Sequence, residues 1–115
     1  MIFRKLTILM MLLSVSIFGC SKEDKKMSVT CDGSNLAYNT GISSIINANC
    51  NNSSCHGSNS PHGSFTTYSG LQGVISNGAF NSQVIVNQTM PQGSSLTQSE
   101  LNKLKCWVDN GYPEN

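Results

Sequence analysis

Charged side chains are scarce in this chain of 115 residues, where they make up 11% of the total. From residue 31 to the end there are only two basic residues, Lys103 and Lys105, against four acidic ones, so the formal net charge of this segment is −2. The four acidic residues are Asp32, Glu100, Asp109 and Glu114. Proteins that bind nucleic acids present a basic face to the phosphates, so no nucleic-acid partner is expected.

Apolar side chains are also few in residues 31–115. More than half of this segment, 46 of 85 residues, is Ser, Asn, Gly, Thr or Gln. A domain this small and this polar buries too little apolar surface to offset its conformational entropy unaided. Natural domains of this kind are stabilised by disulfides, a metal or a large cofactor. We therefore expect a cross-link, a bound group or both.

The apolar run Leu6–Phe18 is too short for a comfortable span of a bilayer. It follows a short basic stretch, Arg4 and Lys5, and this combination predicts a targeting segment over residues 1–19. The run ends in Ile17-Phe18-Gly19-Cys20, which resembles the lipobox of bacterial lipoproteins.

The lipobox resemblance implies cleavage before Cys20 and a lipid on its sulfur, and acyl chains stabilise membrane attachment by about 0.8 kcal/mol per buried CH₂. Residues 20–30 carry several charges and no apolar periodicity, which predicts a solvated tether. The resemblance places the protein in the bacterial cell envelope, facing the periplasm, and Ser21 is compatible with sorting to the outer membrane. A plain secretory signal, with Cys20 there by chance, is the alternative.

The remaining four cysteines divide into two pairs. Cys50 and Cys55 stand next to His56, whereas Cys31 and Cys106 lie at opposite ends of the predicted domain. In an exported protein a left-over pair is more often oxidised than free, so we predict a Cys31–Cys106 disulfide. Closing so long a loop would contribute roughly 4 kcal/mol in the chain-entropy model, less any strain. Pairings that mix these two residues with Cys50 and Cys55 compete with it.

The most informative motif is Cys50-Asn-Asn-Ser-Ser-Cys55-His56. Two thiols on one loop can hold a haem by two thioether bonds, and the imidazole that follows can ligate its iron. The usual attachment spacing is C-x-x-C-H, whereas here four residues separate the cysteines. This interpretation requires that two extra residues loop out while both sulfurs still reach the porphyrin.

Hydrophobic spacing predicts an all-α domain over residues 31–115, with no internal repeat. Ile42, Ile45 and Ile46 indicate a helix to about Asn49, with Thr40 as its cap. The other predicted helices cover residues 67–77 (ended by Gly78), 82–87 (with a strand as the alternative) and 98–110.

The helix over residues 98–110 carries the clearest signals. Thr97-Gln-Ser-Glu100 is a capping-box pattern, and Asn110-Gly111 followed by Pro113 ends the helix. Leu101, Leu104 and Val108 share one face with Trp107 beside them, and Cys106 points away from it. Trp107, like Phe65, Tyr68 and Phe80, is expected in the core.

The order of these features resembles small c-type cytochromes, in particular the haem domains of bacterial envelope lipoproteins. Their landmarks match Cys55-His56-Gly57, Met90-Pro91 and Trp107-Val-Asp-Asn-Gly111, over nearly all of residues 40–112. The resemblance implies a small helical domain wrapped around one covalent haem c, which transfers single electrons to redox partner proteins of the envelope. The negative net charge would favour partners with a basic docking patch.

Residue by residue, the resemblance implies thioether bonds from Cys50 and Cys55, a proximal ligand from His56 and a distal ligand from Met90. A carbonyl near Pro61 is expected to fix the His56 ring. Iron with both axial positions filled by protein opens no substrate site, so the domain is expected to be an electron carrier and not an enzyme. His62 is the rival to Met90, since six residues of extended chain span about 20 Å.

Two other classes of function remain open. In one, Met90 dissociates and the haem senses or reduces a small ligand. In the other, the chain is a haem-free structural lipoprotein with a Cys50–Cys55 disulfide. A zinc site is disfavoured because it needs four converging ligands, and a thiol hydrolase because no base other than His62 stands out near the cysteines.

Overall fold

The structure is a computed structural model, and it describes residue 31 and residues 36–115. In chain order its elements are η1 (Tyr38–Thr40), α2 (Ile42–Asn49), α3 (Tyr68–Ser76), η2 (Asn81–Val86) and α4 (Gln98–Asp109). The described residues contain no strand, so the predicted all-α class holds for them. The predicted signal peptide (1–19), the lipidation site Cys20 and the tether lie outside the described residues. Within the part described, no helix has the length and apolar character needed to cross a membrane.

Helix α2 has the predicted bounds, but its predicted cap is wrong. Thr40 belongs to the 3₁₀ turn η1, and its hydroxyl donates to the Ala37 carbonyl at 3.4 Å. Gly41 therefore precedes the helix, and no side chain caps it. At the other end Cys50 is the C-cap, its N–H donating to the Ile46 carbonyl, so α2 delivers the first cysteine of the motif as expected.

Helix α3 confirms the predicted helix over 67–77, shortened by one residue at each end. The Thr67 side chain accepts a hydrogen bond from the Gly70 N–H and caps the start. Leu71 is fully buried. Gly78 follows the helix with φ +78°, a left-handed conformation that a residue with a Cβ adopts only with strain.

The stretch predicted as a short helix rather than a strand is helical, but of an unexpected type. Residues Asn81–Val86 form a π-helix, in which Asn87 N–H donates to the Ser82 carbonyl five residues back. Such turns are rare in proteins and frequent at functional sites. Val84 packs into the core, whereas Val86 is exposed.

Helix α4 begins with the predicted capping box and ends close to the predicted residue. Thr97 and Glu100 form the capping box in both directions, and Gly111 follows the helix with φ +82°. Leu104 and Trp107 are buried, and Cys106 on another side of the helix is bonded to Cys31 as predicted, with 5.7 Å between the Cα atoms.

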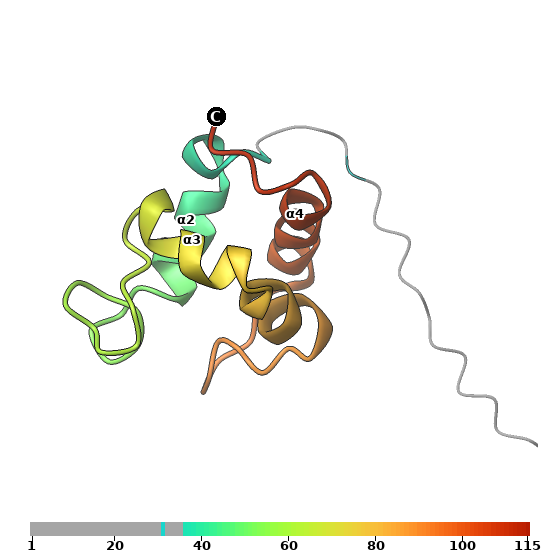
Figure 1. The fold of residues 1–115 in the computed structure, drawn as a ribbon. Helices are drawn as coiled ribbons and strands as arrows, with labels where there is room; N and C mark the ends of the chain where they lie inside the picture. Colours follow the sequence, from blue (N-terminus) through green and yellow to red (C-terminus); the bar gives the residue numbers. More distant parts are fainter. Residues whose placement is uncertain (1–30, 32–35) are drawn as a thin grey trace, which may run out of the picture.

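One end of the domain, which we call the closed end, is held by aromatic packing and by the C-terminal segment. Trp107 is wholly buried, with Tyr38, Phe80 and Tyr112 around its ring, and its Nε1 donates to the Pro113 carbonyl. Backbone bonds tie residues 113 and 114 to η1. Figure 1 shows η1 and the C-terminus together at this end, and the loops 51–64 and 88–97 at the other, which we call the open end.

Candidate functional site

The open end contains a cavity of about 450 Å³. That volume lies in the range of about 300–1,000 Å³ in which proteins bind small molecules and cofactors. All the predicted ligands line it, namely Cys50, Cys55, His56 and Met90, and so does the rival His62. Its apolar lining is Ile46, Phe65, Val74, Ala79, Phe80, Val84, Pro91, Leu96 and Leu104. The structure therefore brings the sequence motif and the Met-Pro segment to one apolar space.

The first wall of the cavity is the loop between the two cysteines. The Cys50 carbonyl accepts a hydrogen bond from His56 N–H at 3.0 Å, so the residues between them bulge outwards. A tight turn inside the bulge is closed by Cys55 N–H, which donates to the Asn52 carbonyl at 3.1 Å. The enlarged gap is thus absorbed locally, and both cysteines still line the same cavity.

Gly57 is required where this bulge folds back on the chain. A Cβ at that position would lie 2.9 Å from the Asn52 carbonyl oxygen and 3.0 Å from that of Asn51. Both atoms belong to the backbone of the bulge, so neither yields without moving it. The glycine after His56 therefore permits the close approach that keeps the cysteine loop compact.

The His56 ring is fixed by two neighbours. Its Nδ1 lies 3.0 Å from the Gly63 carbonyl, two residues beyond the predicted position. Because a carbonyl only accepts, Nδ1 carries the proton in this contact and Nε2 is left with its lone pair free. Phe65 stacks on the ring at a centroid distance of 3.8 Å, and its N–H donates to the His56 carbonyl.

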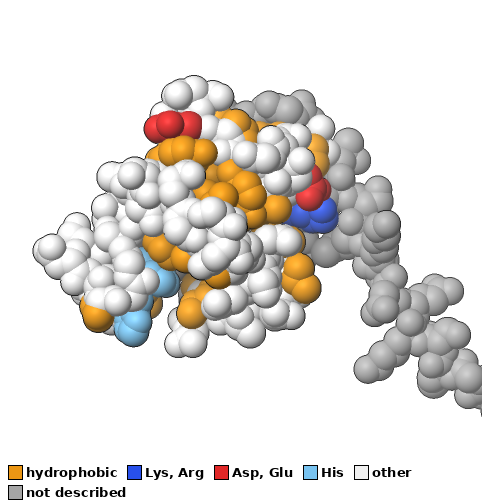
Figure 2. Space-filling model, in the orientation of Figure 1, with side chains coloured by type: hydrophobic (Ala, Val, Ile, Leu, Met, Phe, Trp, Pro, Cys, Tyr) orange, Lys and Arg blue, Asp and Glu red, His pale blue; other side chains and the backbone are white. Residues whose placement is uncertain are grey.

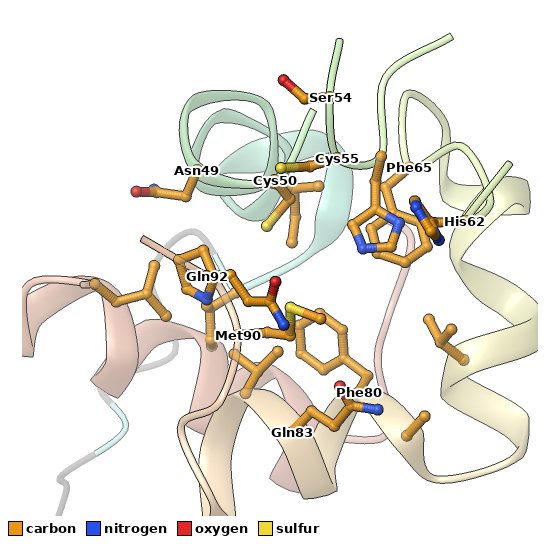
Figure 3. A pocket seen from close by; sticks show the side chains of 18 residues that line it. Asn49, Cys50, Ser54, Cys55, His62, Phe65, Phe80, Gln83, Met90 and Gln92 are labelled. Carbon is orange, nitrogen blue, oxygen red and sulfur yellow. The ribbon is translucent and has the colours of Figure 1, made fainter. Parts of the chain in front are cut away.

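The second wall carries Met90. The Gln83 carbonyl, inside the π-helix η2, accepts from the N–H groups of Thr89 and Met90 at 2.8 and 3.2 Å. These bonds hold the Met-Pro segment against η2, and the Met90 side chain is half-buried. Figure 3 shows Met90, with Phe80 and Gln83 below it, across the cavity from Cys50 and Cys55.

His62 lies on the same loop as His56, exposed at the rim of the cavity. Its N–H donates to the Ser60 hydroxyl, and Gly63 beside it is the acceptor for the His56 ring. The loop is tied on the His56 side of the cavity, whereas Met90 approaches from a separate segment.

The two cysteines of the motif are unpaired in the structure. Burial raises the pKa of the Cys50 thiol to about 11, and the nearby Cys55 adds to the rise. A thiol with that pKa is protonated at neutral pH. In the part of the chain that the structure describes, no three His, Cys, Asp or Glu side chains cluster closely enough to hold a metal ion.

The sequence predicted Phe65 and Phe80 as core residues and not as part of the cavity wall. Phe65 and Phe80 are buried as expected, but both also line the cavity, and Phe65 supports the His56 ring. Gln83 was not predicted at all, because its backbone carbonyl and not its side chain anchors Met90. Trp107 is a core residue and does not line the cavity.

No protein-family model, curated protein or solved structure matches this chain.

Proposed function

We propose that the protein is a one-electron carrier with one covalent haem c, tethered in the bacterial cell envelope by a lipid on Cys20. The observation that carries the proposal is the convergence of Cys50, Cys55, His56 and Met90 on one cavity. Met90 lies far along the sequence from the other three, so their meeting depends on the fold.

The residues of the cavity fit this cofactor. Cys50 and Cys55 would form the thioether bonds, His56 would ligate through Nε2, and Met90 would ligate from the opposite wall. When bound, the iron supplies one-electron chemistry, and a thioether ligand favours its reduced state and raises its potential. The apolar lining suits the apolar faces of the cofactor, and the Gly63 carbonyl holds the His56 ring in one tautomer.

Met90 is favoured over His62 as the distal ligand because the two lie on different supports. His62 shares the loop that orients His56, and moving it to the wall where Met90 lies would disturb the Gly63 contact. Met90 already stands on the facing wall. Because the iron would be held by both His56 and Met90, no site would remain on it for a substrate, and this supports an electron carrier over an enzyme.

The decisive experiment is a haem stain on a denaturing gel, made on protein co-expressed with cytochrome maturation factors. Only covalent haem survives the gel, so the wild type is expected to stain and the Cys50→Ala/Cys55→Ala variant to be colourless. The matched control is Cys31→Ser/Cys106→Ser, which removes the other pair and is expected to stain. A colourless wild type with a Cys50–Cys55 disulfide would instead establish the haem-free structural lipoprotein.

The axial ligands are tested separately by absorption spectroscopy. Met90→Ala is expected to abolish the weak band from thioether to ferric iron, whereas His62→Ala is expected to retain it. An unchanged spectrum in Met90→Ala would transfer the distal role to His62. Carbon monoxide binding to the reduced wild type without denaturation would show a labile Met90 and favour the ligand-sensing function.

A further inference from the structure

The histidine of the cysteine motif is oriented by neutral groups. No Asp, Glu, Lys or Arg occurs between residues 33 and 99, so this stretch supplies no carboxylate to hold the ring. Figure 2 shows the histidine side chains among polar and apolar groups, with the acidic and basic side chains on other parts of the visible surface. The orientation of His56 therefore depends on the Gly63 carbonyl and on the Phe65 ring that stacks on it.

Phe65 is held to the cysteine loop through both polar groups of its backbone. Its N–H donates to the His56 carbonyl at 2.8 Å, and its carbonyl accepts from Nδ2 of Asn51 at 3.1 Å. The side chain is buried, and its ring lies almost parallel to the His56 imidazole, with an angle of 9° between the two planes. The position of this ring is thus set by a residue that lies between the two cysteines.

Asn51 makes this link, and both protons of its amide group are used. Besides the Phe65 carbonyl, Nδ2 donates to the Oδ1 atom of Asn47, a residue of α2, at 2.5 Å. Because a backbone carbonyl only accepts, the amide nitrogen must be the atom that faces Phe65. Asn51 does not line the cavity, so its effect on a bound group passes through its neighbours.

The oxygen of the same amide shows that stability alone does not explain Asn51. This Oδ1 atom is buried, and no group in the described part of the chain donates a hydrogen bond to it. A buried acceptor without a partner costs free energy, and an apolar side chain of similar size would avoid that cost. What Asn51 provides, and such a side chain could not, is the pair of hydrogen bonds from Nδ2.

We propose, resting on the haem-binding function above, that Asn51 is a positioning residue for the proximal ligand. Its amide ties Phe65 to α2, and Phe65 in turn keeps the His56 ring in the orientation that the Gly63 contact requires. The gap between the cysteines is then more than a spacer, because one of its four residues fixes the ring that ligates the iron.

The test is the rate at which the Nδ1 proton of His56 exchanges with solvent, measured by NMR on the reduced, full-length, isotope-labelled haem protein in detergent micelles. Reduced iron with two strong axial ligands is diamagnetic, so the protons of the ring are observable. Asn51→Ala is expected to raise the exchange rate by about fivefold or more, because the ring loses its support.

Asn52→Ala is the matched control. This neighbouring side chain is exposed, and alanine keeps the backbone carbonyl that accepts from the N–H groups of Cys55 and Gly57. The exchange rate of the His56 proton is expected to change by less than about twofold in this variant.

Two further measurements separate positioning from general stability. The indole proton of Trp107, which donates to the Pro113 carbonyl at the closed end, is an internal reference and should exchange at the wild-type rate in every variant. Asn47→Ala removes one of the two acceptors of the Asn51 amide and is expected to raise the His56 rate by about threefold. This milder variant decides the question if Asn51→Ala carries no haem.

Three outcomes would overturn the proposal. An unchanged His56 rate in Asn51→Ala, or in Asn47→Ala where the first variant carries no haem, would mean that Phe65 keeps its place without the amide. An equal rise for the Trp107 and His56 protons would make Asn51 a stabilising residue only. A colourless wild type would end the haem-binding function and this inference with it, whereas a coloured protein with an unchanged rate would refute only the inference.

Discussion

The two ends of the domain are built in different ways. The closed end has the Cys31–Cys106 disulfide, the buried Trp107 and backbone bonds between η1 and the C-terminal segment. The open end is mostly loop, and its backbone bonds arrange side chains around an apolar cavity. Stability and binding are thus assigned to different regions of one small domain.

This separation explains how so polar a chain can hold an apolar cavity open. Filling the cavity with side chains would stabilise the fold, so a domain that leaves it open needs support elsewhere. The disulfide and Trp107, which do not line the cavity, provide that support, and Phe80 connects the aromatic cluster to the cavity wall. Substitutions at the closed end should therefore change stability without changing the spectrum of the proposed haem, and substitutions at the open end should affect that spectrum.

The largest effect is expected for Trp107→Ala at the closed end. Truncating a wholly buried aromatic leaves a cavity and typically costs about 3–5 kcal/mol. Urea unfolding followed by circular dichroism measures the loss, and Val86→Ala, at a side chain that is 67% exposed, is the control with a change below about 0.5 kcal/mol. A loss under about 1 kcal/mol for Trp107→Ala would contradict the role of the closed end.

Removing the disulfide should have the next largest effect. Cys31→Ser/Cys106→Ser is expected to lower the free energy of unfolding by about 2–4 kcal/mol, because the unfolded chain regains the entropy of an open loop. The haem absorption bands should not shift, since neither residue lines the cavity. Non-reducing peptide mapping is the check on the wild type, and a free thiol at Cys31 or Cys106 would refute the pairing.

A smaller effect, located at the open end, is expected for Gly70→Ala. A Cβ at Gly70 would overlap the Ser64 carbonyl oxygen, and the shift would pass to Phe65 and so to the His56 ring. The expected cost is about 1–3 kcal/mol, accompanied by a change in the haem absorption bands. Gly73→Ala in the same helix is the matched control, because nothing lies within 4 Å of its Cβ position, and it should stabilise α3 by up to about 1 kcal/mol.

The glycine pair also marks the limit of what the sequence could predict. Both glycines lie inside the predicted helix and look equally unfavourable there. Only the return of the loop to Ser64 makes Gly70 necessary and leaves Gly73 free. The helices themselves were predictable because periodicity and capping residues are local signals, as Thr97 and Glu100 illustrate.

The candidate site was predictable in its members and only in part in its supports, since a carbonyl near Pro61 was expected for the His56 ring and the Gly63 carbonyl takes that role. Cys50, Cys55, His56 and Met90 are set apart by spacing and residue type. Their supports are the Gly63 carbonyl, the Phe65 ring and the Gln83 carbonyl, and each contact joins segments several residues or more apart. Every residue offers the same carbonyl whatever its side chain, so residue type does not show which carbonyl will act as an acceptor. Residue type also does not show that Thr40 belongs to a 3₁₀ turn instead of capping α2.

Glu100, near the start of α4, connects this helix to α2. Its carboxylate accepts from Thr97 N–H at 2.8 Å and from the Asn49 side chain at 3.1 Å, which links the start of α4 to the end of α2, next to Cys50. These hydrogen bonds, first from the Thr97 backbone, then from the Thr97 hydroxyl and Asn49, lower the pKa of Glu100 below its usual value.

The smallest effect is expected for Glu100→Gln, at about 0.5–1 kcal/mol, since the carboxylate is partly exposed and screened by water. Because the folded-state pKa is lowered, the carboxylate stabilises the fold above its unfolded pKa of about 4.3, and this contribution disappears as the pH falls through the lower folded value. Urea unfolding of wild type and variant should therefore differ at pH 7 and converge in acid. Asp109→Asn, which breaks only the exposed pair with Lys105, is the control with little effect at either pH. A difference that persists unchanged in acid would mean that Glu100 acts through packing, and the link between α2 and α4 would then not depend on its charge.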